Sequence, residues 1–167
     1  LTSVYWSRAT ENTKWPSALV LTRQKVPAVP KNLGSVGSPY QGGWIVAKES
    51  TSDPKVVLVA TGSEVSLALD VRKQLESQSI ATRVVSLLSW EIFRAQSAEY
   101  RTNIMSGDRA LRVSIEAASS FGWHEWVGRE GLTISIDHFG ASAPANELFK
   151  QFGFDPNAIV EKIRTKL

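Results

Sequence analysis

The sequence predicts an α/β fold in three layers, with a mostly parallel sheet that carries helices on both faces. The first indication is segment 56–75, where an aliphatic run ends at Gly62 and apolar residues then follow at helical spacing. The second is the run 56–59, which is typical of a strand buried on both faces of a parallel sheet. The third is that the same order of strand and helix returns along the chain, which places successive strands in parallel.

The residues before position 44 show a different pattern from this strand and helix. Residues 4–15 could form a helix and residues 17–22 a short strand. Seven Pro and Gly residues then fall between positions 27 and 43, which marks a linker and a domain boundary. We therefore expect residues 1–26 to be the end of one domain, residues 27–41 a linker, and residues 42–167 a second domain.

Inside the second domain, Thr61 is expected to cap a helix while Glu64 returns a bond to the backbone of the cap. The buried face of this helix is formed by apolar residues at helical spacing: Val65, Ala68, Leu69 and Leu75. The predicted elements are strand 44–47, strand 56–60, helix 64–77, strand 82–86, helix 90–95, helix 97–105, strand 110–115, helix 121–128 and strand 132–136.

Two helices are predicted at the end of the chain. Pro144 opens the first and Gly153 ends it, and its apolar face is Leu148, Phe149 and Phe152. Asp155 caps the second and Pro156 begins it. The apolar side of this second helix is Ile159, Val160, Ile163 and Leu167.

Composition places the chain among ordinary folded proteins, with 43% hydrophobic and 21% charged residues. Its 167 residues fit one domain, or one domain plus a piece of another. The absence of cysteine excludes disulfides, thiolate metal sites and cysteine nucleophiles. No apolar stretch is long enough for a membrane span, and the start resembles no signal peptide. Because it begins at Leu1, the chain is expected to be a piece of a longer protein.

Charge is distributed unevenly. The formal net charge is +3, and residues 1–40 hold five basic residues against one acidic residue. The remaining residues are nearly neutral, so the main domain lacks the basic face of a nucleic-acid binder. The basic excess is interpreted as a solvated surface or, alternatively, as a local site for a phosphorylated small molecule.

The turn at 61–64 could hold an anion at the helix start. Gly62 is a lone glycine, however, and Glu64 adds a negative charge, so a plain capped turn is favoured. Ser135, Asp137 and His138 are close in sequence, but no G-x-S-x-G motif accompanies them, which argues against a hydrolase triad.

The two histidines, His124 and His138, could join Glu116, Glu125 or Asp137 at a metal. Neither histidine has a second one at ligand spacing, so ordinary polar or interfacial positions are favoured. Trp123 and Trp126, three residues apart on a predicted helix, favour a core or a subunit interface over a platform for stacking nucleic-acid bases.

Taken together and in order, seven motifs resemble the transketolase family over essentially the whole chain. The resemblance departs from the family at Leu88, where proline is common, and is loose over the first fifteen residues. The motifs are Leu-Val-Leu-Thr-Arg-Gln at 19–24, Gln-Gly-Gly-Trp at 41–44, Ala-Thr-Gly-Ser-Glu-Val at 60–65, Arg-Val-Val-Ser at 83–86, Phe93 with Gln96, Tyr100 and Arg101, Gly122 and Trp123 with Trp-Val-Gly at 126–128, and Phe-Gly-Ala-Ser-Ala-Pro-Ala at 139–145 before Glu-Leu-Phe at 147–149.

The resemblance implies the end of the middle, pyrimidine-binding domain over 1–26, the linker, and the C-terminal domain over 42–167. Transketolases transfer a two-carbon ketol unit between sugar phosphates with thiamine diphosphate and a divalent metal, Mg²⁺ or Ca²⁺. The resemblance places the cofactor motifs in upstream domains, so the chain alone is expected to bind no cofactor or metal and to be inactive. It contains no catalytic residue of the family, but Arg23 matches the arginine that contacts the sugar phosphate, a role that suits a guanidinium.

The remaining role implied for the C-terminal domain is packing against upstream domains of its own chain and in a homodimer. The expected contact surface is Trp123, Trp126, Phe139 and Ala143 to Ala145. The implied location is the cytoplasm. Two alternatives stay open: a fragment of dihydroxyacetone synthase, since Thr165, Lys166 and Leu167 resemble a peroxisomal signal, or a non-catalytic binding or regulatory module. The preferred sugars cannot be inferred from these residues.

Overall fold

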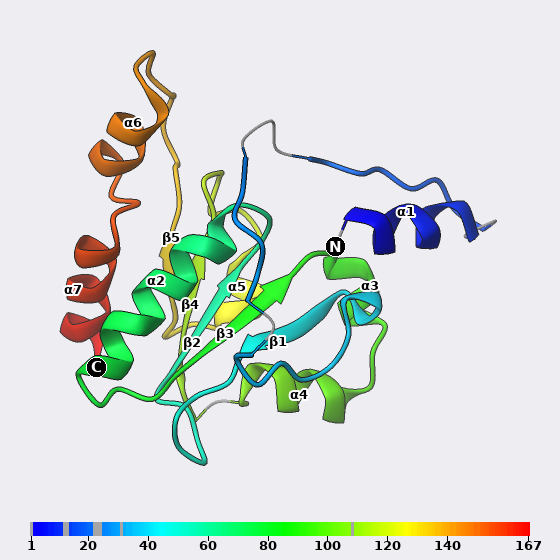
Figure 1. The fold of residues 1–167 in the computed structure, drawn as a ribbon, viewed down its shortest axis with the longest axis horizontal. Coiled ribbons are helices and arrows are strands. Elements are labelled where there is room, and N and C mark those ends of the chain that lie inside the picture. Colours follow the sequence, from blue (N-terminus) through cyan, green and yellow to red (C-terminus); the bar gives the residue numbers. More distant parts are fainter. Residues whose placement is uncertain (1, 12–13, 22–24, 31, 108) are drawn as a thin grey trace.

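The computed structural model describes residues 2–11, 14–21, 25–30, 32–107 and 109–167. At its centre lies a five-stranded sheet in the order β1-β3-β2-β4-β5 (Figure 1). Four strands run parallel, and β1 pairs with β3 in the antiparallel direction. The predicted, mostly parallel sheet is therefore confirmed, with one antiparallel edge. The strands are β1 (Gly43–Ala47), β2 (Val56–Ala60), β3 (Thr82–Leu87), β4 (Leu111–Ile115) and β5 (Leu132–Ile134).

Alternate residues of β2 point into two separate apolar clusters. Val56, Leu58 and Ala60 pack with α2 and α7 on one face, whereas Val57 and Val59 pack with α3, α4 and α5 on the other. All five β2 residues are buried, which explains their unbroken aliphatic sequence. The predicted three layers are thus present. The helices are α2 (Glu64–Ser77), α3 (Trp90–Arg94), α4 (Ala98–Met105), α5 (His124–Val127), α6 (Ala145–Gln151) and α7 (Pro156–Lys166).

The helix α7 begins as the sequence predicts. The carboxylate of Asp155 accepts hydrogen bonds from the N–H groups of Asn157 and Ala158 at 3.0 and 3.2 Å, and Pro156 occupies the first helical turn. The apolar face then packs on α2, with Ile159, Val160 and Ile163 buried. Leu167 does not join this face as predicted: it follows the last helical residue and is 57% exposed.

The N-terminal segment departs from its predicted structure. The first helix, α1 (Thr2–Glu11), lies to one side of the sheet (Figure 1), and the predicted continuation to residue 15 is absent at residues 14 and 15. Residues 17–21 form no strand. A strand needs a hydrogen-bonded neighbour, and no described strand pairs with residues 17–21, where Val20 is 94% exposed. A 3₁₀ helix, η1 (Pro39–Gln41), leads into β1.

Two elements are shorter than predicted. The helix expected at 121–128 is regular only as α5, and the strand expected at 132–136 ends at Ile134. After this strand, residues 137–144 are all exposed and lead to α6, which projects from the body of the domain (Figure 1). No described helix has the length and apolar character that crossing a bilayer requires.

A buried ion pair connects elements on the face of the sheet that α3, α4 and α5 cover. Arg83 on β3 binds both carboxylate oxygens of Glu49, at 2.6 and 2.8 Å. The same guanidinium donates to the carbonyl oxygens of Asn103 and Ile104 at the end of α4, at 2.6 and 3.1 Å. Arg83 therefore links the sheet, the loop after β1 and α4 through one side chain.

Candidate functional site at the carboxyl edge of the sheet

The candidate site lies where the direction of strand addition reverses. From β2 the chain passes through α2 to β3 on one side, whereas β4 pairs with β2 on the other side. Ligands of open α/β sheets bind in the crevice outside the carboxyl ends of the strands at such a point. Here two loops meet, residues 61–64 after β2 and residues 116–120 after β4.

The hydroxyl groups of the first loop make other hydrogen bonds than the sequence predicts. Thr61 does not cap α2: its hydroxyl donates to the carboxylate of Glu116 at 2.7 Å. Ser63 is the residue before the helix and makes no cap bond either, because its hydroxyl binds both carboxylate oxygens of Glu64 at 3.0 and 3.2 Å. The predicted capping box is therefore wrong. Carboxylates are stronger acceptors for a hydroxyl than neutral groups are, and both hydroxyls are bound to carboxylates.

Burial raises the pKa of two carboxyl groups at this edge. Glu64 is only 6% exposed, and burial raises its pKa against the lowering effect of Ser63. Burial also raises the pKa of Glu116, and the charge of Glu64 raises it further, against the hydrogen bond from Thr61. An acidic residue in the first turn of α2, Glu64, and a second one directly after β4, Glu116, disfavour a phosphate there, so the competing anion site at 61–64 gains no support from this geometry.

The residues considered for a hydrolase triad are not brought together. Asp137 accepts from the Ser120 N–H at 2.8 Å and from the Ser119 hydroxyl at 3.1 Å, and these bonds lower its pKa. His138 instead places Nδ1 2.8 Å from the carbonyl oxygen of Phe139. The buried hydroxyl of Ser135 has no hydrogen-bond partner among the residues that the structure describes. No nucleophile and base are paired here.

The carboxylates and histidines considered for a metal also remain apart. Glu125 pairs with Arg94, and Glu116 is bound to Thr61. Among the residues that the structure describes, no group of three or more histidines, aspartates and glutamates could hold a metal ion.

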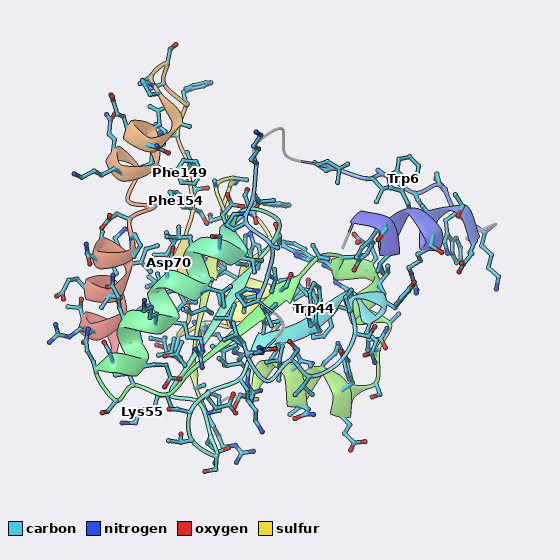
Figure 2. The ribbon with its side chains drawn as sticks, in the orientation of Figure 1. Trp6, Trp44, Lys55, Asp70, Phe149 and Phe154 are labelled. Atoms are coloured by element: carbon cyan, nitrogen blue, oxygen red, sulfur yellow. The ribbon has the colours of Figure 1, made fainter. Side chains whose placement is uncertain are left out.

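A groove beside the candidate site was missed by the sequence reasoning. It has a volume of about 460 Å³ and lies between residues 25–27, the first half of α2, α6 and the start of α7. Phe149 on α6 and Phe154 between α6 and α7, with ring centres 5.5 Å apart, line the groove with Asp70 on α2 (Figure 2). Residues 25–27, more than a hundred positions before α6, complete its wall, and no periodic pattern in the sequence indicates that contact.

Comparison with known proteins identifies the family. The sequence model of the transketolase-like C-terminal domain matches residues 42–155, which is more than half of the chain. The chain belongs to the transketolase family. The resemblance inferred from the seven motifs is therefore confirmed.

Individual transketolases match nearly the whole chain. The chloroplastic transketolase of Spinacia oleracea is 42% identical over 94% of this chain, and a Staphylococcus epidermidis transketolase is 38% identical over 98%. The chain spans 21% and 25% of the length of these two proteins. It therefore corresponds to a fifth to a quarter of a typical transketolase.

Solved transketolases share the fold. The structure from Campylobacter jejuni superposes with a TM-score of 0.86 over 98% of this chain at 29% identity, and the match covers 24% of that protein. The transketolase of Leishmania mexicana gives a TM-score of 0.68 over 76% of this chain at 38% identity, covering 18% of that protein.

Arg23, the one substrate contact implied by the transketolase resemblance, lies outside the described residues, which omit 22–24. Part of the predicted contact surface is wrong: Trp123 and Trp126 are 2% and 5% exposed and belong to the core of their own domain. They pack around Trp90, at 5.2 and 5.9 Å between ring centres. Phe139, by contrast, is 99% exposed, as are Ala143 to Ala145 to a large extent.

Proposed function

We propose that this chain is the C-terminal part of a transketolase that transfers a two-carbon ketol unit between sugar phosphates. The observation that carries the proposal is the match of the C-terminal-domain model to residues 42–155. Relatives of 38% to 43% identity over 88% to 98% of the chain support it. We expect the parent enzyme in the cytoplasm.

The cofactor of the parent enzyme would be thiamine diphosphate with Mg²⁺ or Ca²⁺. The described residues of this chain do not fit such a group. A diphosphate needs cationic or N–H donors and its metal needs grouped oxygen ligands, whereas the candidate edge presents two carboxyls of raised pKa. We therefore assign cofactor binding to the upstream domains and derive no catalytic step from this chain.

The proposed role of residues 42–167 is packing, against the upstream domains and in a homodimer. Two apolar side chains at the candidate edge support this role, Phe121 with 88% and Phe139 with 99% of its surface exposed. Large exposed aromatic residues are a feature of protein contact surfaces. Sugar phosphates remain the proposed substrates, with Arg23 as the phosphate contact.

Calorimetry with thiamine diphosphate and Mg²⁺ tests whether the cofactor site lies outside these residues. The 167-residue chain should give no saturable heat, because both cofactor contacts lie elsewhere. The intact parent enzyme, titrated under the same conditions, is the positive control. Saturable binding to the chain alone would contradict the proposal, since it would require a complete cofactor site within these residues.

A further inference from the structure

The groove between residues 25–27, α2, α6 and α7 is large enough for a small organic ligand. Its volume is about 460 Å³, and sites that enclose small molecules measure roughly 300 to 1,000 Å³. The walls come from three separate parts of the chain: residues 25–27, the first half of α2, and α6 with the residues that lead into α7. A ligand in the groove therefore contacts all three parts at once.

One part of the groove is aromatic and incompletely covered. Phe149 on α6 and Phe154 before α7 pack with their ring centres 5.5 Å apart and their planes at 61°. Phe154 is only 4% exposed, whereas Phe149 and Leu67 on α2 are half-buried and line the groove. An apolar group that covers Phe149 and Leu67 would remove apolar surface from water, which favours binding.

Charged side chains of both signs surround this aromatic surface. Lys25 and Lys150 lie on different walls of the groove, and Asp70 lies on α2. None of the ion pairs among the described residues involves these three side chains. The carboxylate of Asp155, which also lines the groove, already accepts the two hydrogen bonds that cap α7. Two ammonium groups and one carboxylate are thus available to a ligand.

We propose that this groove binds a free amino acid with an aromatic or branched apolar side chain. The carboxylate of the ligand accepts hydrogen bonds from the lysines, its ammonium group donates to Asp70, and its side chain covers Phe149. A ligand with only one of the two charges fits less well. An acid without the ammonium group brings a second negative charge beside Asp70, and an amine without the carboxylate brings a third positive charge beside the lysines.

The bound amino acid joins parts of the chain that lie more than a hundred positions apart. Lys25 and Val26 belong to the predicted end of the preceding domain, whereas α2, α6 and α7 belong to the predicted second domain. The ligand therefore bridges the two predicted domains. Because it binds the folded arrangement of these walls, it should also stabilise the chain by mass action.

Titration of the 167-residue chain with phenylalanine, followed by the NMR shifts of backbone amides, tests the site. Saturable shifts should be confined to the groove, at residues 25–26, 63–70 and 145–155. Phenylpropionate lacks the ammonium group and phenylethylamine lacks the carboxylate. Each should bind about three- to tenfold more weakly than phenylalanine, the value of one hydrogen bond to a partly exposed group. The Tm should rise with the phenylalanine concentration.

Variants of exposed side chains assign the two charged contacts. Asp70→Asn and Lys150→Gln should each weaken phenylalanine binding about three- to tenfold. Asp70→Asn should also reduce the preference for phenylalanine over phenylpropionate, because the repelling carboxylate is gone. Lys73→Gln is the matched control, since Lys73 is exposed on α2 but does not line the groove.

Because Asp70, Lys73 and Lys150 are all exposed, the three variants should keep the Tm of the unliganded chain. The proposal is overturned if phenylalanine gives no saturable shifts at millimolar concentration, or if the shifts lie outside the groove. It is equally overturned if phenylpropionate binds as tightly as phenylalanine, or if Lys73→Gln weakens binding as much as Asp70→Asn does.

Discussion

The Arg83 side chain donates hydrogen bonds to Glu49, Asn103 and Ile104 in the described core. It is paired with Glu49, and their side chains are 8% and 0% exposed. Burial raises the pKa of Glu49, but the hydrogen bonds and charge of Arg83 together lower it below the ordinary value. This contribution to stability is present above the ordinary glutamate pKa of about 4.3 and is lost as pH falls through the lowered folded value.

Replacing Arg83 by leucine should therefore be strongly destabilising, because Glu49 would stay buried without its partner. We expect a loss of about 3 to 5 kcal/mol in the free energy of unfolding at neutral pH, measured by urea titration. The double change Arg83→Leu with Glu49→Leu should recover part of this loss. Arg164→Gln, which removes an exposed pair with Glu161, is the control and should cost under about 0.5 kcal/mol. Equal costs for Arg83→Leu and Arg164→Gln would refute this account.

Arg23 carries the prediction about substrate handling in the intact parent enzyme. If its guanidinium holds the sugar phosphate, Arg23→Ala should raise KM for phosphorylated sugars about ten- to a hundredfold, since such a bond contributes roughly 1.5 to 3 kcal/mol. Arg23→Lys should lose less. Steady-state kinetics with a sugar phosphate and its unphosphorylated analogue give the comparison, because the analogue should be nearly unaffected. Equal losses on both substrates would assign Arg23 a structural role.

At the scale of elements, the local sequence pattern predicts an element correctly where each residue contacts its own element or needs only an apolar surface to pack against. The run at 56–60 is a strand and the Asp155 and Pro156 start of α7 is present, because burial and capping are encoded within a few residues. The predicted capping by Thr61 was wrong because its acceptor lies 55 residues later. No pattern within one helix could indicate that partner.

The strand predicted at 17–22 was wrong over its described part for a related reason. Its residues have strand-forming side chains, but a strand depends on a neighbour to which its backbone can bond. The spacing of Trp123 and Trp126 is compatible with either a core or an interface. The packing of both rings against Trp90 places them in the core. The acidic character of the candidate site likewise depends on the pairing of β2 with β4, which places the loops of Glu64 and Glu116 at the same edge of the sheet.

At the scale of the whole molecule, we expect the chain to self-associate weakly through the exposed residues at its carboxyl edge. Sedimentation velocity over a range of concentrations should show a rising sedimentation coefficient. Changing Phe121 and Phe139 together to alanine should reduce the rise, because these side chains are 88% and 99% exposed and their burial would favour association.

The control for this experiment is Trp6→Ala. Trp6 is also exposed, at 56%, but lies on α1, which packs beside η1 at the β1 end of the sheet, whereas Phe121 and Phe139 follow β4 and β5 (Figure 2). Its replacement should leave association unchanged. A chain that stays monomeric at high concentration, or a double variant that associates as strongly as the original, would remove this surface from consideration.

The two edges of the sheet determine what kind of association is open to the chain. An exposed edge strand offers unpaired backbone groups on which another chain can add a strand and begin a fibre. Here β1 is bridged on its outer side by Val36, which exchanges hydrogen bonds with Ile45 at 3.1 and 2.9 Å, and β5 at the other edge has only three residues. The described sheet is thus poorly suited to growth by strand addition, so concentrated solutions should form discrete, reversible oligomers and resist amyloid-like aggregation.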